Sequence, residues 1–154
     1  MRCCYLFAAL ACALPLGCSS SGASGGGSTV KGKVLFNGNP VAGARVIFTD
    51  GKEEGIPSGP TALSDESGEY AIVGAKPGSY KVVVYKLVAK PGATLPTDDS
   101  GAPDLVQLEA SGAGYHALPQ KYSRVTSTTL TAQVNEGSND IDLKLTGKVE
   151  RAGP

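Results

Sequence analysis

Few side chains in this chain of 154 residues could act as a nucleophile, a general base or a metal ligand. Histidine occurs once, at His116, in a stretch rich in Gly, Ala and Tyr. Nucleophilic catalysis needs a base beside the nucleophile, and no Gly-x-Ser-x-Gly turn is present to position a serine. One histidine and no cysteine beyond Cys18 also make a zinc site improbable. The sequence therefore predicts that the protein is not an enzyme and has no catalytic residue. We expect His116 to be an ordinary loop side chain.

Clustered carboxylates suggest a second, weaker chemistry. Asp98, Asp99 and Asp104 supply oxygen donors of the kind that calcium prefers. Their spacing is not that of a calcium-binding loop. Asp65 and Glu69 bracket a Gly-containing turn, as ordinary turn chemistry would. We expect no cofactor and no metal, and keep the three aspartates only as weak calcium candidates.

Charge and cysteine content narrow the class of protein. The chain has 14 basic and 14 acidic residues, so it offers no electrostatic basis for binding nucleic acid. Its cysteines are confined to the first 18 residues: Cys3, Cys4, Cys12 and Cys18. A domain without disulfides must be stabilised by its apolar core.

The N-terminal segment has the parts of a secretory signal peptide. Arg2 gives a positive start, an apolar run covers residues 3–16, and small residues surround Cys18. The run is too short to span a membrane comfortably, which takes about 20 apolar residues. We expect a signal peptide over residues 1–17, followed by a Ser/Gly tether that ends at residue 28.

This arrangement of a signal peptide, a cysteine and a polar tether resembles a bacterial lipoprotein signal. The resemblance implies lipidation at Cys18 and an exported, membrane-anchored protein. Ser19 follows the cysteine, rather than the Asp that marks retention at the inner membrane, so the outer membrane or cell surface is favoured. The alternative is cleavage near Cys18 without lipidation, which would leave a secreted domain.

Beyond the tether, short apolar segments alternate with Gly, Pro, Asn and Asp turns, a pattern typical of an all-β sandwich. Residues 29–146 are predicted to form one domain, and residues 147–154 a disordered tail. The expected strands cover residues 30–36, 44–49, 69–73, 80–88, 129–134 and 140–145. The intervening segment 90–128 is longer than a usual connection and contains four prolines, which predicts a long irregular insertion.

The expected strand over residues 80–88 is apolar on both faces. If Tyr80, Val82 and Val84 face the core, then Val83, Tyr85 and Leu87 form a stripe on the other face. Such a stripe is usually covered. One interpretation is that residues 105–118 fold back over it; the other is that it is an exposed docking surface.

The turns of the first half of the domain have a specific pattern. It consists of Gly32-Lys33-Val34, Pro40 to Val46, Asp65 to Tyr70, and Pro77 to Val82. Together these motifs resemble the transthyretin-like, carboxypeptidase-regulatory-like domain. The resemblance implies an all-β, seven-stranded Greek-key sandwich of the transthyretin-like or Ig-like kind. It specifies a scaffold, and a function must be argued from a site on it.

A related sandwich, the collagen-adhesin B-type repeat, can form a Lys–Asn isopeptide bond between its first and last strands. By that resemblance Lys31 or Lys33 could be joined to Asn139. Strand alternation points both lysines to solvent, whereas such a bond needs them buried, so this interpretation is disfavoured.

Taken together, the sequence predicts a non-catalytic, lipid-anchored envelope or surface module with a binding or structural role. Its expected partners are a membrane, through the lipid, and an unidentified envelope protein or glycan. The alternative is a carbohydrate- or protein-binding accessory domain secreted without an anchor. The candidate binding surface comprises Val83, Tyr85, Leu87, Tyr115, His116 and Tyr122.

Overall fold

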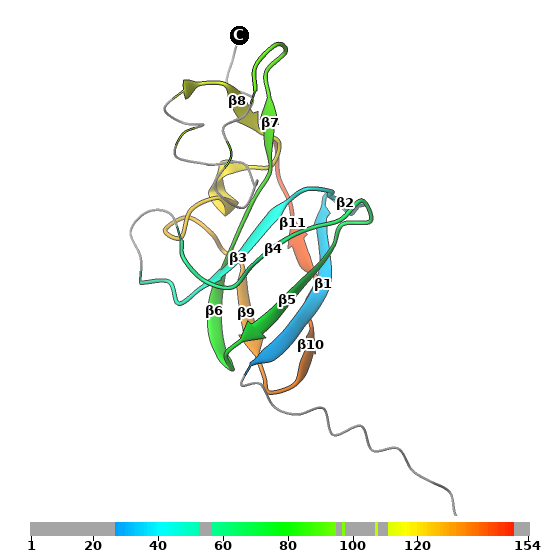
Figure 1. The fold of residues 1–154 in the computed structure, drawn as a ribbon, viewed down its shortest axis with the longest axis vertical. Helices are drawn as coiled ribbons and strands as arrows, with labels where there is room; N and C mark the ends of the chain where they lie inside the picture. Colours follow the sequence, from blue (N-terminus) through cyan, green and yellow to red (C-terminus); the bar gives the residue numbers. More distant parts are fainter. Residues whose placement is uncertain (1–26, 53–56, 95–96, 98–106, 108–110, 150–154) are drawn as a thin grey trace, which may run out of the picture.

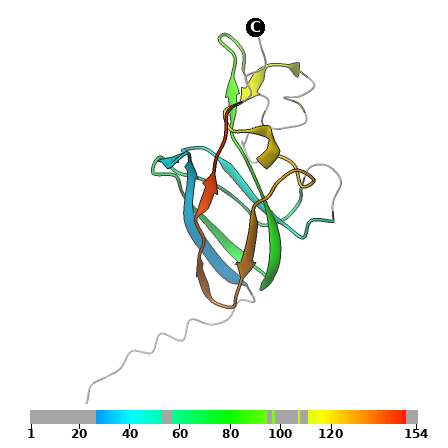
Figure 2. The same ribbon diagram turned by 180° about the vertical axis from the view of Figure 1, so that it is seen from behind.

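A computed structural model describes residues 27–52, 57–94, 97, 107 and 111–149. Two β-sheets pack face to face, and a small two-stranded ribbon rises from one end of the sandwich (Figure 1). The same layers are seen from behind in Figure 2. The prediction of an all-β sandwich is confirmed. Within the described part of the chain, no helix is long and apolar enough to cross a membrane.

The first sheet is built around β1 (Ser28–Phe36). On one side β1 pairs antiparallel with β5 (Glu69–Ala75) and with the short β2 (Asn39–Pro40). On its other side β1 pairs in parallel with β10 (Ser138–Asp140) and β11 (Leu143–Leu145). Strand β1 is therefore central, with neighbours on both edges.

The second sheet has the strand order β4-β3-β6-β9, all antiparallel. Its members are β4 (Thr61–Leu63), β3 (Arg45–Thr49), β6 (Gly78–Tyr85) and β9 (Thr131–Val134). Strand β6 occupies a central position here, as β1 does in the first sheet. Strands β9 and β10 follow one another along the chain and lead from one sheet to the other.

The ribbon consists of β7 (Leu87–Ala89) and β8 (Gly114–His116), which pair antiparallel. A single 3-10 turn, η1 (Gln120–Tyr122), follows it. The ribbon lies at the end of the molecule opposite to Ser28, where β1 begins (Figure 1). The segment 90–128, predicted to be irregular, thus contains short regular elements among its described residues.

The main core lies between the two sheets. Val30, Val34 and Ile72 come from the first sheet, and Val46 and Val84 from the second. Phe48 is fully buried among them and makes ring contacts with Tyr70 and Tyr80. Each fully buried aliphatic or aromatic side chain contributes about 1.5–3 kcal/mol to folding. The inward positions expected from alternation in the strands over residues 30–36 and 80–84 are confirmed.

Two expected strands are split in the structure. Residues 80–88 divide into β6 and β7 around Lys86, and residues 140–145 divide into β10 and β11 around Ile141. The split after β6 lets the chain leave the sheet and form the ribbon. For this reason, and because β2, β4 and β8 are additional short strands, the described residues contain more than the seven strands predicted.

The stripe on the outer face of β6 is covered. Val83, Tyr85 and Leu87 are 0%, 4% and 7% exposed, and they pack with Ile47 and Val125 in a second apolar cluster. The interpretation of the stripe as an exposed docking surface is therefore wrong. The predicted cover was residues 105–118, of which residues 107 and 111–118 are described. Val125, beyond that range, packs on the stripe, whereas Leu118 belongs to the main core.

Candidate functional site: a charged groove over β1

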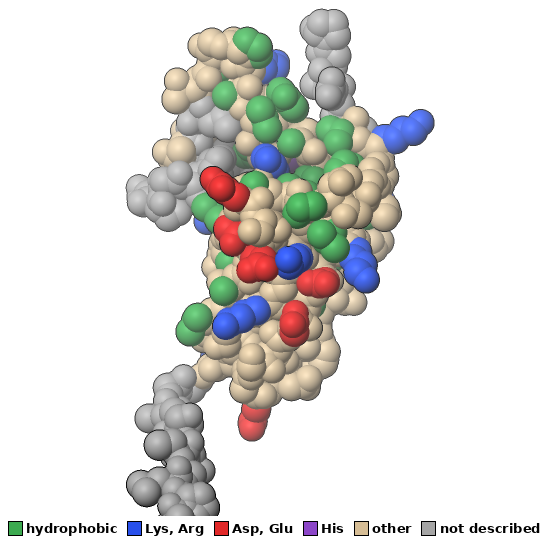
Figure 3. Space-filling view, turned by 90° about the vertical axis from the view of Figure 1, so that its right-hand side faces the viewer, with side chains coloured by type: hydrophobic (Ala, Val, Ile, Leu, Met, Phe, Trp, Pro, Cys, Tyr) green, Lys and Arg blue, Asp and Glu red, His purple; other side chains and the backbone are tan. Residues whose placement is uncertain are grey.

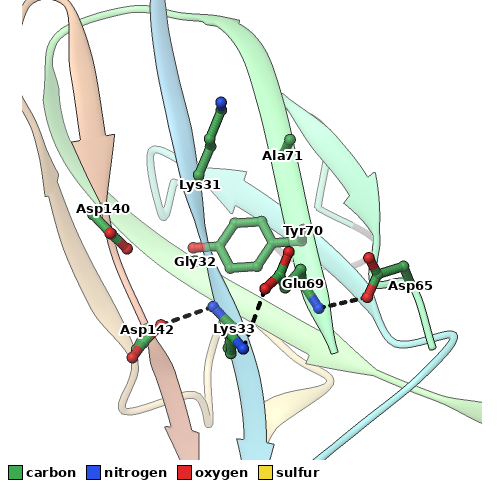
Figure 4. A pocket seen from close by; sticks show the side chains of 9 residues that line it. All are labelled: Lys31, Gly32, Lys33, Asp65, Glu69, Tyr70, Ala71, Asp140 and Asp142. Carbon is green, nitrogen blue, oxygen red and sulfur yellow. Dashed lines mark hydrogen bonds and ion pairs between the residues drawn. The ribbon is translucent and has the colours of Figure 1, made fainter. Parts of the chain in front are cut away.

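An open groove of about 580 Å³ lies on the first sheet (Figure 4). Basic and acidic side chains gather on this face (Figure 3). The groove is lined by Lys31, Gly32, Lys33, Asp65, Glu69, Tyr70, Ala71, Asp140 and Asp142. It therefore combines two cations with four carboxylates over the strands β5, β1 and β10–β11.

Strand alternation on β1 sets the walls of the groove. Val30 and Val34 point into the core, so Lys31 and Lys33 point outward and are exposed. Between the lysines lies Gly32, and a Cβ there would stand 1.9 Å from the carbonyl oxygen of Ile141. Only glycine fits at this position, because the backbone of Ile141 comes so close to it.

The parallel ladder between β1 and the last strands is interrupted at this close approach. The N–H of Ile141 donates to the carbonyl of Lys31 at 2.7 Å, as a ladder bond would. The next hydrogen bond along β1 is accepted by a side chain. The N–H of Lys33 donates to Oδ1 of Asp142 at 2.8 Å. The carboxylate of Asp142 thus replaces a backbone carbonyl and keeps β1 attached across the break.

Tyr70 stabilises the structure at the same interruption of the ladder. It lies on β5, which pairs with the other edge of β1. Its ring lies across β1 at Gly32, with the hydroxyl directed toward the last strands (Figure 4). The hydroxyl donates to the carbonyl oxygen of Ile141 at 2.7 Å. Burial, together with the negative charges of Asp142 and Asp140, raises the pKa of Tyr70 well above its ordinary value. Tyr70 therefore remains a neutral hydrogen-bond donor at physiological pH.

The other acidic groups of the groove are largely engaged in local structure. Oδ1 of Asp65 accepts the N–H groups of Ser67 and Glu69, both at 2.8 Å, and so shapes the turn before β5. Glu69 forms an ion pair with Lys33 at 3.2 Å, between side chains that are about half exposed. An exposed pair of this kind contributes little to stability, about 0–1 kcal/mol.

What the groove can do chemically follows from these contacts. No base is positioned beside a nucleophile among its lining residues, and no group of three metal-ligating side chains occurs among the described residues. The groove offers exposed charges of both signs, led by Lys31 and Asp140. The sequence predicted by alternation that Lys31 and Lys33 point outward. It could not bring the groove residues together, because the pairing of β1 with the last strands is not visible in the sequence.

The candidate binding residues from the sequence do not form a surface. His116 is 6% exposed and lies in β8 opposite Leu87, so it is a buried strand residue and not the loop side chain predicted. Tyr115, its neighbour, is half-buried. Tyr122 is 3% exposed. With Val83, Tyr85 and Leu87 also buried, the predicted surface is wrong for all these residues except Tyr115.

Tyr122 instead fastens the end of the domain. Its hydroxyl accepts from the N–H of Thr146 and donates to the carbonyl of the same residue, both at 3.1 Å. The side-chain amide of Asn37 pairs in the same way with the N–H and carbonyl of Gly147, at 3.3 Å and 3.1 Å. Two side chains thus act as a strand partner for the chain just after β11.

The isopeptide interpretation is wrong in this structure. Lys31 and Lys33 are exposed on the outer face, as alternation predicted. Asn139 is 8% exposed, and its side-chain amide bridges the turn from β9 to β10, accepting from the N–H of Asn135 and donating to its carbonyl, each at 2.8 Å. The amide therefore serves the turn and does not face either lysine.

Two further sets of predicted residues lie outside the described residues. The weak calcium candidates Asp98, Asp99 and Asp104 are among them, and so is the lipidation candidate Cys18. Both predictions stay as they were.

Comparison with protein-family models gives a match over most of the chain. The model of the carboxypeptidase regulatory-like domain matches residues 29–146. No curated protein matches the chain.

Solved structures give remote likenesses. A variant of BcpA, the major pilin subunit of Bacillus cereus, is 15% identical with a TM-score of 0.40, covering 78% of this chain and 29% of that one. A DUF3823 family protein from Parabacteroides merdae is 13% identical with a TM-score of 0.37, covering 77% of this chain and 45% of that one. The chain thus spans less than half the length of either protein. Such low scores carry no argument about function.

Proposed function

Since this chain belongs to the carboxypeptidase regulatory-like domain family, we propose that it is a non-catalytic module of the cell envelope, held at a membrane by a lipid on Cys18. Its β-sandwich would have a structural or binding role there. The family supplies a scaffold, and function on a scaffold depends on the sites it carries.

The observation that carries the proposal is how the tether joins the domain. Strand β1 begins at Ser28, directly after the Ser/Gly segment that follows Cys18. A Ser/Gly segment of this length would hold the domain about 15–20 Å from the membrane. Because the start of β1 and the β7–β8 ribbon lie at opposite ends of the molecule (Figure 1), the ribbon would point away from the membrane.

The engagement of the chemistry-bearing side chains supports a role without catalysis. Tyr70 and Asp142 hold the break beside Gly32, and Tyr122 fastens the end of β11. Each of these groups is used by the fold itself. The exposed charges of the groove, Lys31 and Asp140 among them, are the groups left to meet a partner.

Fractionation and intact mass test the anchor. We expect the wild type in the membrane fraction, with a mass that begins at Cys18 and carries a lipid adduct. Cys18→Ala should lose both the adduct and the processed mass. Cys12→Ala is the matched control, since it removes a cysteine from the predicted signal peptide, and it should behave as the wild type does.

An unlipidated wild-type mass that begins near residue 18 would overturn the proposed anchor. The protein would then be a secreted domain, and its partner would have to be sought among soluble or extracellular molecules.

A further inference from the structure

Beyond this anchored role, the free edge of β5 has the properties of a contact surface. Along β1, the N–H of Val34 donates to Gly68 and its carbonyl accepts from Val41, so the backbone of Val34 points toward the β5 side. Backbone groups of alternate residues point the same way. Gly32 and Val30 therefore bond to their partners Tyr70 and Ile72.

The intervening residues of β5 point their backbone groups away from β1. The N–H and carbonyl of Glu69 are both bonded to Asp65. Ala71 and Val73 have no such partner among the described residues, and both are exposed. A short, unpaired stretch of strand edge thus runs from Ala71 to Val73, with two donors and two acceptors directed to solvent.

This edge also lacks the usual protection. Free edges in soluble proteins are normally guarded by lysine, proline or a bulge. Strand β5 contains neither lysine nor proline, and its one irregularity lies beyond Val73, at Gly74. The large hydrophobic side chains exposed in the described part of the chain are Val73, at 80%, and Leu63, at 51%, on the adjoining strand β4.

We propose that β5 pairs antiparallel with β5 of a second copy of this chain, about a twofold axis at Ile72. In this register Ala71 of each copy exchanges backbone hydrogen bonds with Val73 of the other. Shifting the axis to Ala71 would require the backbone groups of Glu69, which Asp65 already occupies. Shifting it to Val73 would use Ala75, which lies past the bulge and is fully buried.

The side chains favour the same arrangement. On the outer face, Val73 of one copy lies against the small Ala71 of the other, which removes its apolar surface from water. Antiparallel pairing also brings Lys76, exposed at one end of β5, toward Glu69 at the opposite end of the partner strand. Like charges are not opposed in this register. The first sheet of one copy and the first sheet of the other then form one continuous sheet.

The edge of β9 provides an internal comparison. The carbonyl of Leu130 accepts from Val82, so by alternation Thr131 and Gln133 direct their backbone groups outward, with the same spacing as Ala71 and Val73. Their side chains are polar, and that of Gln133 is bonded to Ser79. Strand β9 therefore has an equivalent backbone edge without the exposed apolar side chains.

Cysteine cross-linking of the full chain tests the register. Paired residues in an antiparallel ladder have Cα atoms about 5.5 Å apart, within the range of a disulfide. After oxidation, Ala71→Cys/Val73→Cys should give a reducible dimer on a non-reducing gel. The wild type, which has no cysteine in the described domain, sets the baseline. The matched control, Thr131→Cys/Gln133→Cys, should stay at that baseline.

A second variant makes the result independent of disulfide formation. Sedimentation of the purified full chain should show a concentration-dependent dimer. Val73→Lys should raise its dissociation constant at least tenfold, and Gln133→Lys should leave it unchanged. Unchanged melting temperatures would show that both variants fold. A wild type that remains monomeric at high concentration, or cross-linking that is equal at β5 and β9, would overturn the proposal.

Discussion

The outer faces of the two central strands, β1 and β6, differ in their exposure to solvent. Lys31 and Lys33 on β1 are exposed beside a charged groove. Val83 and Tyr85 on β6 are buried beneath the segment that carries Val125. Alternation decides which side chains leave the core, but whether they then reach solvent depends on where the rest of the chain runs.

The two faces differ in what they contribute. Exposed charges such as Lys33 and Glu69 add little stability, so this face can change without loss of the fold. Burial of Val83, Tyr85 and Leu87 adds about 1.5–3 kcal/mol for each side chain. The outer face of β6 is thus a second core, while that of β1 remains available for contacts.

Gly32→Ala should cause the largest loss of stability, because it would disrupt the pairing of β1 with the last strands. The new Cβ would stand 1.9 Å from the carbonyl oxygen of Ile141 and push the last strands away from β1. We expect a loss of about 3 kcal/mol or more in the free energy of unfolding, measured by denaturant titration.

The matched control is Gly38→Ala. Gly38 has a φ of 87° and nothing within 4 Å of its added Cβ, so it tests backbone strain without a clash. Its cost should be about 1–2 kcal/mol. Equal losses for the two variants would show that the close approach at Gly32 is not what holds the last strands.

Val83→Ala sharpens the comparison between the two outer faces. Val83 is fully buried, so the variant loses apolar burial and leaves a cavity, at a cost of about 2 kcal/mol. Lys31→Ala, at an exposed position on β1, should change stability by less than about 0.5 kcal/mol. A similar cost for both, in thermal or denaturant unfolding, would mean that the β6 face is not a second core.

Tyr70→Phe should cost less than Val83→Ala, about 1 kcal/mol at neutral pH, through loss of the hydrogen bond to Ile141. Its pH dependence is more specific. The pKa of Tyr70 is raised in the folded state, so the unfolded state releases this proton first, and wild-type stability falls as the pH rises above about 10. Melting temperatures between pH 9 and 11.5 should fall less steeply in Tyr70→Phe, and parallel curves would contradict the assignment.

Much of the fold could be predicted from the local sequence pattern. Alternation correctly placed Val30, Val34 and Val84 in the core and the lysines of β1 outside. Turn chemistry located the reversal at Asp65, whose carboxylate accepts two backbone N–H groups as expected of such turns. These features depend on residues close together in the chain, and so a single sequence reveals them.

The groove could not be predicted from the local sequence pattern. Its floor depends on contacts such as that between Lys33 and Asp142, which are 109 residues apart. The burial of His116 and Tyr122 likewise follows from packing against distant strands, and no local pattern distinguishes them from exposed loop residues.

The sequence alone determined the β class, the inward and outward side chains of the central strands, and the turns, because these follow from backbone sterics and a two-residue period. Only the tertiary structure decided that β10 and β11 join β1 in parallel, that the stripe on β6 is covered, and that β5 pairs on one edge only with a strand of the described residues. Each of these depends on which segments meet in space. That choice is made by the packing of the whole chain, which no local spacing records.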